Sequence, residues 1–332
     1  MKNLYTFKKI TLGLILSALL FSCERNSTFE DTKPSIAKIA VLNSDFSVLE
    51  TTAIKGGVAL LLTNANAGDP SGKFTVFAPT NGAFAKLGLN SDNLATLNPD
   101  FLTNTLKYAV SNGDLLSGSF TGTSASALSG LTRKFIEKDG QKYINGSKII
   151  ATDIAAANGT VHAIDKVLLA TGGDIVESAI AVQTGKVFVQ PELTYLVEAV
   201  LWASNLPDGT SIATALSTLP SLTVFAPNDA AFIALLKVFN KPFSKPTDIK
   251  ELPKDVVRDV LLNNVLGGGK FTPELNSGAN ASVGGGVLTL SAFADGVMTV
   301  KGNNNATPAK MLIPDIQATN GVIHIIDTVL LP

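Results

Sequence analysis

Two sequence segments occur twice in this chain, in the same order, and this duplication limits the fold more than any other feature. Residues 74–84 return as residues 222–232 with seven identities in eleven positions. Residues 158–169 return as residues 320–331 with eight identities in twelve positions. Each unit is far longer than the roughly 20 to 45 residues of a solenoid repeat. The duplication therefore predicts two self-sufficient domains rather than a stacked array.

The N-terminus predicts export and attachment to a membrane. Three lysines precede an apolar stretch over residues 10–21, which is too short to span a bilayer as a helix. The stretch leads to Cys23, the only cysteine of the chain, in a sequence that resembles a bacterial lipoprotein cleavage site. We expect residues 1–22 to be a signal peptide and Cys23 to carry two acyl chains of the palmitate type, because one chain holds a soluble domain only weakly. The alternative is an ordinary secretory signal with a chance cysteine.

Composition indicates a compact exported protein. Apolar residues make up 45% of the chain, enough for two cores, and charged residues only 16%. Removing residues 1–22 removes three lysines and no acid, which leaves 23 basic and 27 acidic side chains and a net charge near −4. This balance argues against a nucleic-acid partner, which normally requires a basic face. Residues 23–34 are polar and without periodicity, so they predict a tether between the lipid and the first domain.

Local patterns predict the order of elements within each unit. Residues 35–62 carry apolar side chains at helical spacing and predict two helices. Residues 75–77 predict a strand that ends at Pro79, because proline supplies no amide to a ladder. Thr80 or Asn81 then stands where it can cap a helix. The second unit repeats this order.

The later part of each unit predicts strands and tight turns. Residues 139–140, 145–146 and 295–296 are Asp-Gly or Asn-Gly pairs, which favour hairpin turns. Residues 161–169 and 323–331 predict long buried strands. Since helices come first and strands later, the predicted class is α+β.

The two repeated segments resemble the signature segments of fasciclin-type adhesion domains. Thr-Val-Phe-Ala-Pro precedes Asn-Gly-x-x-His-x-Ile-Asp-x-Val-Leu-Leu in each half, with domain-sized spacing between them. The resemblance implies two fasciclin-like domains, over residues 35–170 and 173–332. It also implies that each is a wedge-shaped β-sandwich with helices packed at one edge, and that both are extracellular modules for adhesion or matrix contact.

The same resemblance suggests candidate binding residues. Some animal relatives use an Asp-Ile pair just before the second segment for integrin contact. This chain has Asp153 and Ile154 there in the first unit, and Asp315 and Ile316 in the second. The alternative is that the isoleucines fill the core and the aspartates cap a turn.

One family feature is missing from this chain. Many relatives carry a Tyr-His pair midway between the two segments, and by position it falls at Tyr108-Ala109 and at Asn263-Asn264. Neither copy keeps the histidine. An adhesive role that rests on that pair is therefore not expected here.

The histidines of the chain are His162 and His324, at equivalent positions of the two units. A lone histidine on a buried strand is more often a hydrogen-bonded core residue than a ligand or a base. Asp165 and Asp327 lie three positions later and face the other side of a regular strand, which argues against a His-Asp catalytic pair. All four residues are predicted to be structural.

No pattern indicates an enzyme, a cofactor or a metal site. The chain lacks a Cys/His cluster, a Gly-x-Ser-x-Gly turn and a phosphate-binding loop. A pair of catalytic carboxylates assembled from distant residues stays open.

The sequence therefore predicts a lipid-anchored protein of the cell envelope, at the outer membrane of a Gram-negative bacterium. We expect it to bind a protein or a glycan at the cell surface. The alternative is a structural spacer, or a subunit of a surface assembly, with no separable ligand.

Overall fold

The computed structural model covers the predicted globular part of the chain. The predicted signal peptide, Cys23 and most of the predicted tether lie outside the described residues, as does Asp295 of one predicted turn. Within the described part, no helix is long and apolar enough to cross a membrane. The structure describes residues 33–332 apart from 95–96, 126–127, 185–192, 205, 207–208, 239–244 and 295.

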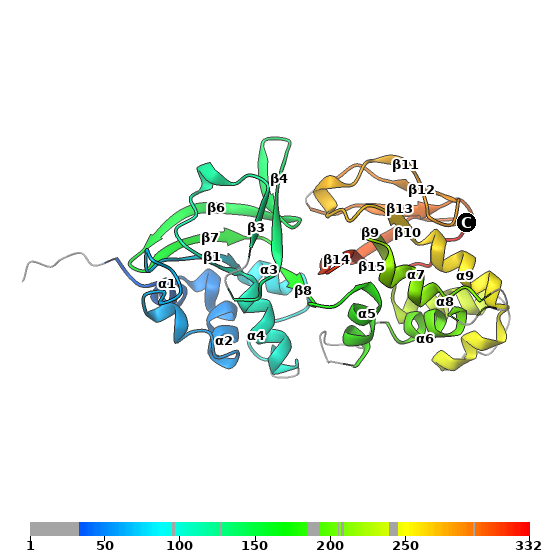
Figure 1. The fold of residues 1–332 in the computed structure, drawn as a ribbon, viewed down its shortest axis with the longest axis horizontal. Coiled ribbons are helices and arrows are strands. Elements are labelled where there is room, and N and C mark those ends of the chain that lie inside the picture. The colour runs from blue at the N-terminus through cyan, green and yellow to red at the C-terminus, as the bar shows by residue number, and fades with distance from the viewer. Residues whose placement is uncertain are drawn as a thin grey trace, which may run out of the picture. The chain divides into compact units, whose positions relative to one another are not determined.

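The first repeat unit combines helices with a seven-stranded sheet of order β2-β1-β7-β6-β5-β4-β3 (Figure 1). Its helices are α1 (Ile36–Leu42), α2 (Ser47–Lys55), α3 (Asn81–Ala85) and α4 (Pro99–Tyr108), with the 3-10 helices η1 (Ser44–Phe46), η2 (Leu61–Thr63) and η4 (Ser117–Ser119). Its strands are β1 (Phe74–Pro79), β2 (Val110–Asn112), β3 (Thr123–Ala125), β4 (Thr132–Lys138), β5 (Gln141–Ile144), β6 (Ser147–Ala156) and β7 (Gly159–Ile164).

The second unit repeats this arrangement with the strand order β10-β9-β15-β14-β13-β12-β11, and β8 (Leu169–Ala170) pairs with β14. Its helices are α5 (Ile175–Thr184), α6 (Thr194–Ala203), α7 (Ile212–Thr218), α8 (Asp229–Val238) and α9 (Lys254–Asn263), with η5 (Pro246–Glu251) and η6 (Thr272–Glu274). Its strands are β9 (Leu222–Pro227), β10 (Val265–Gly267), β11 (Gly278–Ala281), β12 (Val287–Leu290), β13 (Thr299–Gly302), β14 (Ala309–Ala318) and β15 (Gly321–Ile326).

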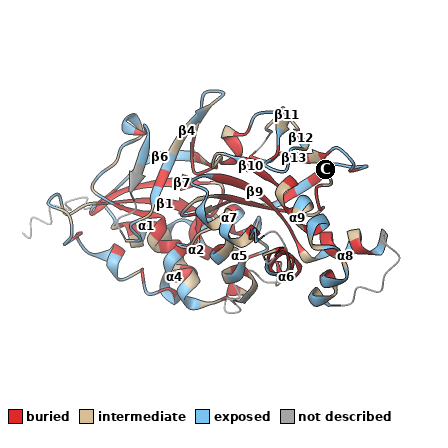
Figure 2. Cartoon of the chain, turned by 45° about the vertical axis from the view of Figure 1, so that its right-hand side comes forward, coloured by how far each residue is buried: buried red, intermediate tan, exposed pale blue. Residues whose placement is uncertain are grey.

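The two repeated sequence segments form neighbouring parallel strands in each unit. β1 pairs with β7, where Phe77 lies opposite His162, and β9 pairs with β15, where Phe225 lies opposite His324. These central strands are buried on both faces, as Figure 2 shows, which explains their almost continuous apolar sequence. Apart from the parallel pair of β8 with β14, the remaining strand pairs within each unit's sheet are antiparallel. The predicted α+β class is confirmed.

Alternating side chains of β1 enter two different cores. Val76 and Ala78 pack in the cluster formed with the helices. Phe77 points to the other face, where its ring centroid lies 5.9 Å from that of Phe120 and 5.8 Å from that of Phe135. This alternation follows from the two-residue period of a strand.

The predicted helix cap after β1 is Thr80, whose side chain accepts a hydrogen bond from the amide of Ala83 at 3.3 Å. Asn81 has a different role, because its side-chain oxygen accepts the amide of Val48 in α2 at 3.0 Å. The end of the strand is thereby tied to a helix earlier in the chain.

Two strands are shorter than the sequence predicts. Residues 161–169 do not form a single strand, since β7 ends at Ile164. The carboxylate of Asp165 accepts the amide of Lys148 at 2.7 Å and turns the chain at the end of the β6–β7 pair. In the second unit β15 ends at Ile326, so the strand predicted over residues 323–331 is also too long.

Candidate functional site

Each Asp-Ile pair lies in an irregular stretch of a long strand. The pairing of β6 with β7 shifts register between Ala151 and Ile154, and that of β14 with β15 shifts between Ile313 and Ile316. At these shifts the two aspartates have positive φ values, 58° and 67°. Side-chain-bearing residues seldom adopt this conformation, and its use here is typical of a β-bulge.

In the first domain a histidine holds the bulge in place. The Nδ1 atom of His162 accepts the backbone amide of Asp153 at 3.1 Å. Its Nε2 atom lies 2.8 Å from the carbonyl oxygen of Leu115. Because Nδ1 accepts a hydrogen bond, the ring proton lies on Nε2, and the imidazole bridges two backbone segments as a neutral group.

The second domain repeats this bridge. The Nδ1 atom of His324 accepts the amide of Asp315 at 3.2 Å, and Nε2 lies 3.1 Å from the carbonyl oxygen of Lys270. Burial lowers the pKa of both histidines, because a charged ring loses its hydration there. In both domains the histidine therefore joins two backbone segments as a neutral group.

The first-domain aspartate caps a short helix and faces solvent. Asp153 accepts hydrogen bonds from the amide of Ser117 at 2.9 Å and from its hydroxyl at 2.5 Å. The Ser117 hydroxyl is the largest cause that lowers the pKa of this carboxyl. Ile154 is half buried and packs against the main core. Asp153 is thus an exposed carboxylate on a fixed backbone.

The second-domain aspartate makes the same cap but is buried. Asp315 accepts the amide of Thr272 at 2.6 Å and its hydroxyl at 2.8 Å. It also forms an ion pair at 2.8 Å with Lys166, which belongs to the first domain. Asp315 is 6% exposed and Ile316 2%. In this structure the second pair therefore offers no accessible surface for a partner.

Lys166 is the centre of a contact between the two domains. Besides Asp315, its ammonium donates to the carbonyl oxygen of Gly296 at 2.7 Å and to the hydroxyl of Thr272 at 3.3 Å. The sequence analysis did not predict this contact. The available signal was that the second copy has an uncharged residue, Thr328, where the first copy has this lysine.

Gln317 adds further links between the domains. Its side-chain oxygen accepts from the side chain of Asn145 at 2.8 Å and from the hydroxyl of Tyr108. Its side-chain nitrogen donates to the carbonyl oxygen of Thr132 at 2.8 Å. Tyr108, the residue at the family's Tyr-His position in the first domain, therefore faces the second domain.

Asp165 and Asp327, which occupy equivalent positions in the two repeats, are hydrogen-bonded to backbone amides. Asp165 accepts the amide of Lys148, and Asp327 accepts that of Lys310 at 2.8 Å. Both therefore hold the ends of strand pairs. Among the residues that the structure describes, no group of three His, Cys, Asp or Glu side chains is placed to hold a metal ion.

The chain is similar to a known domain family and to several known proteins. The model of the Fasciclin domain family matches residues 44–170 and 199–332. Protein sll1483 of Synechocystis is 35% identical over 141 residues, which are 42% of this chain and 75% of that protein. Transforming growth factor-beta-induced protein ig-h3 of Sus scrofa is 26% identical over 274 residues, which are 79% of this chain and 35% of that protein. The chain thus covers about a third of the length of ig-h3.

Among solved structures, the chain is similar to a FAS1 domain pair from the insect cell adhesion molecule Fasciclin I. It is 15% identical and has a TM-score of 0.38, covering 89% of this chain and 96% of that one.

Proposed function

Because the chain belongs to the fasciclin domain family, we propose that it is a lipid-anchored binding protein of the bacterial cell envelope. Fasciclin domains are associated with cell adhesion or binding. The anchor is Cys23, which follows a basic, apolar leader of signal-peptide type. The partner is a protein or a glycan at the cell surface.

The observation that carries the proposed binding role is the exposed carboxylate of Asp153. Two hydrogen bonds from Ser117 fix its side chain, and His162 fixes its backbone. A group that is already held in one geometry loses little freedom on binding, so more of the contact energy remains as affinity. An exposed carboxylate of this kind suits an Arg or Lys side chain of a protein, or the hydroxyls of a glycan.

Binding assays with two exposed aspartates test this proposal. Full chain carrying Asp153→Asn is compared with wild type on immobilised collagen, fibronectin and mucin. Asp139→Asn is the matched control, because Asp139 is also exposed in the first domain and also has a positive φ. We expect Asp153→Asn to weaken binding by about tenfold, which is what loss of one charge-assisted hydrogen bond costs. Equal binding by the two variants would count against Asp153 as the contact.

The second candidate function is a structural spacer, which the contact between the domains favours. The ion pair of Lys166 with Asp315 and the hydrogen bonds of Gln317 hold residues of both domains together. A spacer needs such a fixed connection and no separable ligand. In that case none of the immobilised proteins binds wild type in a saturable way.

A further inference from the structure

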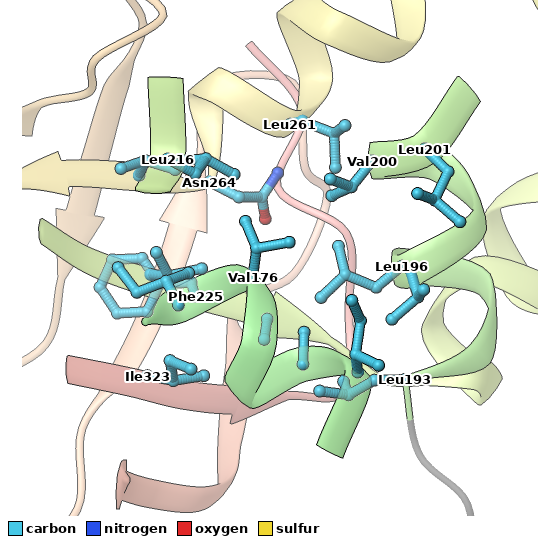
Figure 3. A pocket seen from close by; sticks show the side chains of 17 residues that line it. Val176, Leu193, Leu196, Val200, Leu201, Leu216, Phe225, Leu261, Asn264 and Ile323 are labelled. Carbon is cyan, nitrogen blue, oxygen red and sulfur yellow. The ribbon is translucent and has the colours of Figure 1, made fainter. Parts of the chain in front are cut away.

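The first domain contains a large apolar cavity between its first helices and the central strands. It lies under α1 and α2, measures about 370 Å³, and has β1, β7 and the end of α4 on its other sides. The second domain has the corresponding pocket under α5 and α6, where the cavity measures about 40 Å³ (Figure 3). The same fold is therefore open at this place in one copy and filled in the other.

Hydrogen bonds that recur in both domains establish which residues correspond. The amides of Ile36 and Ile175 donate to the equivalent Asn158 and Asn320, both at 2.9 Å, which aligns α1 with α5. In the first domain the amide of Val48 in α2 donates to the side chain of Asn81, the first residue of α3, at 3.0 Å. In the second domain the amide of Tyr195 in α6 donates to the side chain of Asp229, the first residue of α8, also at 3.0 Å. These two bonds align α2 with α6. The pairing of β1 with β7 and of β9 with β15 aligns the strands.

At five corresponding positions around the cavity, the first domain carries the smaller side chain. Figure 3 labels the larger residue of four of these pairs in the filled pocket. Phe46, which corresponds to Leu193, and Ile39, which corresponds to Ser178, differ in the opposite direction. The smaller side chains at the five positions contribute to the open cavity. The pairs are Ala37 and Val176, Val41 and Ile180, Ala53 and Val200, Ala109 and Asn264, and Val161 and Ile323.

The lining of the cavity is apolar in its depth and polar only near solvent. Its polar side chains are exposed or half buried, so they belong to the mouth; they are Ser35, Lys38, Glu50 and Thr63. Two apolar lining residues are also exposed, Val41 at 52% and Ile54 at 64%. Apolar surface therefore continues from the buried strands out to the rim.

We propose that this cavity binds the hydrocarbon chain of a fatty acid and leaves its carboxylate at the mouth. The volume lies within the roughly 300 to 1,000 Å³ of small-molecule sites in proteins, which are also mostly apolar. The buried part of the ligand must lack hydrogen-bonding groups, since such groups would lose their hydration without gaining a partner. An elongated chain covers both the interior and the rim at Val41 and Ile54, whereas a compact ligand leaves the rim exposed. Lys38 supplies a cation at the mouth, which Glu50 also lines.

The second domain shows that the fold does not require this cavity. Valine at two of these positions, Val176 and Val200, is compatible with the same helices and strands there. An unfilled apolar cavity normally lowers the free energy of unfolding. A ligand that occupies the cavity offers a physical reason for keeping it, and this reason is independent of the proposed partner binding at Asp153.

The test measures binding of saturated fatty acids of 8 to 16 carbons to the full chain by calorimetry. The chain carries Cys23→Ala, so that its own acyl groups cannot compete. Each methylene buried contributes enough to strengthen binding about fourfold. We expect one fatty acid per chain, with an affinity that rises by this factor per methylene and levels off when the cavity is full.

Variants that copy the second domain provide the decisive comparison. Ala37→Val with Ala53→Val fills the cavity and should weaken binding of hexadecanoic acid at least tenfold. Ala85→Val is the matched control, since Ala85 lies on the exposed side of α3 and does not line the cavity. Val161→Ile is a milder filling variant in case the double variant does not fold, as judged by circular dichroism.

The binding of each variant decides whether fatty acids occupy the cavity. Weaker binding by a folded filling variant, with wild-type binding by Ala85→Val, supports the proposal. Equal binding by the filled and the wild-type cavity overturns it. Affinity that does not depend on chain length, or binding that does not saturate, also overturns it.

Discussion

The two buried histidines link backbone segments that are far apart in the chain. Each accepts the amide of a bulged aspartate and contacts a carbonyl oxygen of the loop after the edge strand. Both rings are completely buried. A protonated ring could not accept at Nδ1, so protonation breaks the bond that shapes the bulge.

This neutral state predicts how stability depends on pH. Burial lowers the pKa of His162 and His324 in the folded protein, whereas the unfolded histidines bind protons near their ordinary value of 6.5. The unfolded state therefore holds more protons below about pH 6.5, and the free energy of unfolding falls as the pH falls through this value. We expect a loss of at most about 1 kcal/mol per histidine between pH 7 and pH 5.5.

Urea unfolding at the two pH values measures this loss. His162→Gln removes one titrating group and should reduce the loss. The carboxyl of Asp153 does not contribute in this range, because its pKa is lowered from an already acidic value. An unchanged pH dependence in His162→Gln would show that other groups cause the effect.

The two aspartates of the bulges predict very different stability effects. Asp315→Asn leaves the buried ammonium of Lys166 without its carboxylate, which costs about 3 to 5 kcal/mol. Asp153→Asn weakens only an exposed cap, at about 1 kcal/mol or less. Chemical denaturation of both variants measures the difference. Similar losses would contradict the buried position of Asp315.

At the scale of elements, the repeated segments give each domain its two central strands. β1 and β7 are parallel and lie side by side, although the intervening chain contains most of the sheet. The second segment begins with Asn158, whose side chain accepts the amide of Ile36 and donates to the carbonyl oxygens of Leu62 and Asn64. One residue thus connects the strand, the first helix and the loop before β1.

The glycine after Asn158 allows the close approach of these strands. Gly159 has a φ of 149°, and a Cβ atom there would lie 1.8 Å from the carbonyl oxygen of Phe74. Gly159→Ala should therefore prevent folding of the first domain or cost more than about 3 kcal/mol, since the backbone itself must move. Gly140→Ala is the control, with a φ of 69° in open space, and should cost about 1 to 2 kcal/mol. Thermal unfolding compares the two, and equal effects would contradict the close strand contact.

Much of this element order follows from local sequence patterns. The break between the first two helices, the end of β1 at Pro79 and the cap at Thr80 all depend on neighbouring residues. The early end of β7 does not, because it depends on a bond between Asp165 and the amide of Lys148 on another strand. The accessibility of each Asp-Ile pair also could not be predicted, since Asp315 is covered by a lysine of the other domain.

At the scale of the whole molecule, the two copies keep one fold and differ in what they expose. The first domain presents Asp153 and an open apolar cavity. The second has its Asp-Ile pair buried and its pocket filled. Each difference involves a few side chains that differ between the two copies, such as Lys166 and Ala53. We infer that the first domain carries the contacts with ligands and that the second supports it.

Protease treatment of intact cells tests most directly whether these domains work at the cell surface on a lipid anchor. Wild type is compared with Cys23→Ala by immunoblot. We predict that added protease removes the domains from wild-type cells, and that Cys23→Ala is released or found in another cell fraction. Wild-type protein that resists the protease until the outer membrane is opened would contradict surface binding and favour a periplasmic structural role.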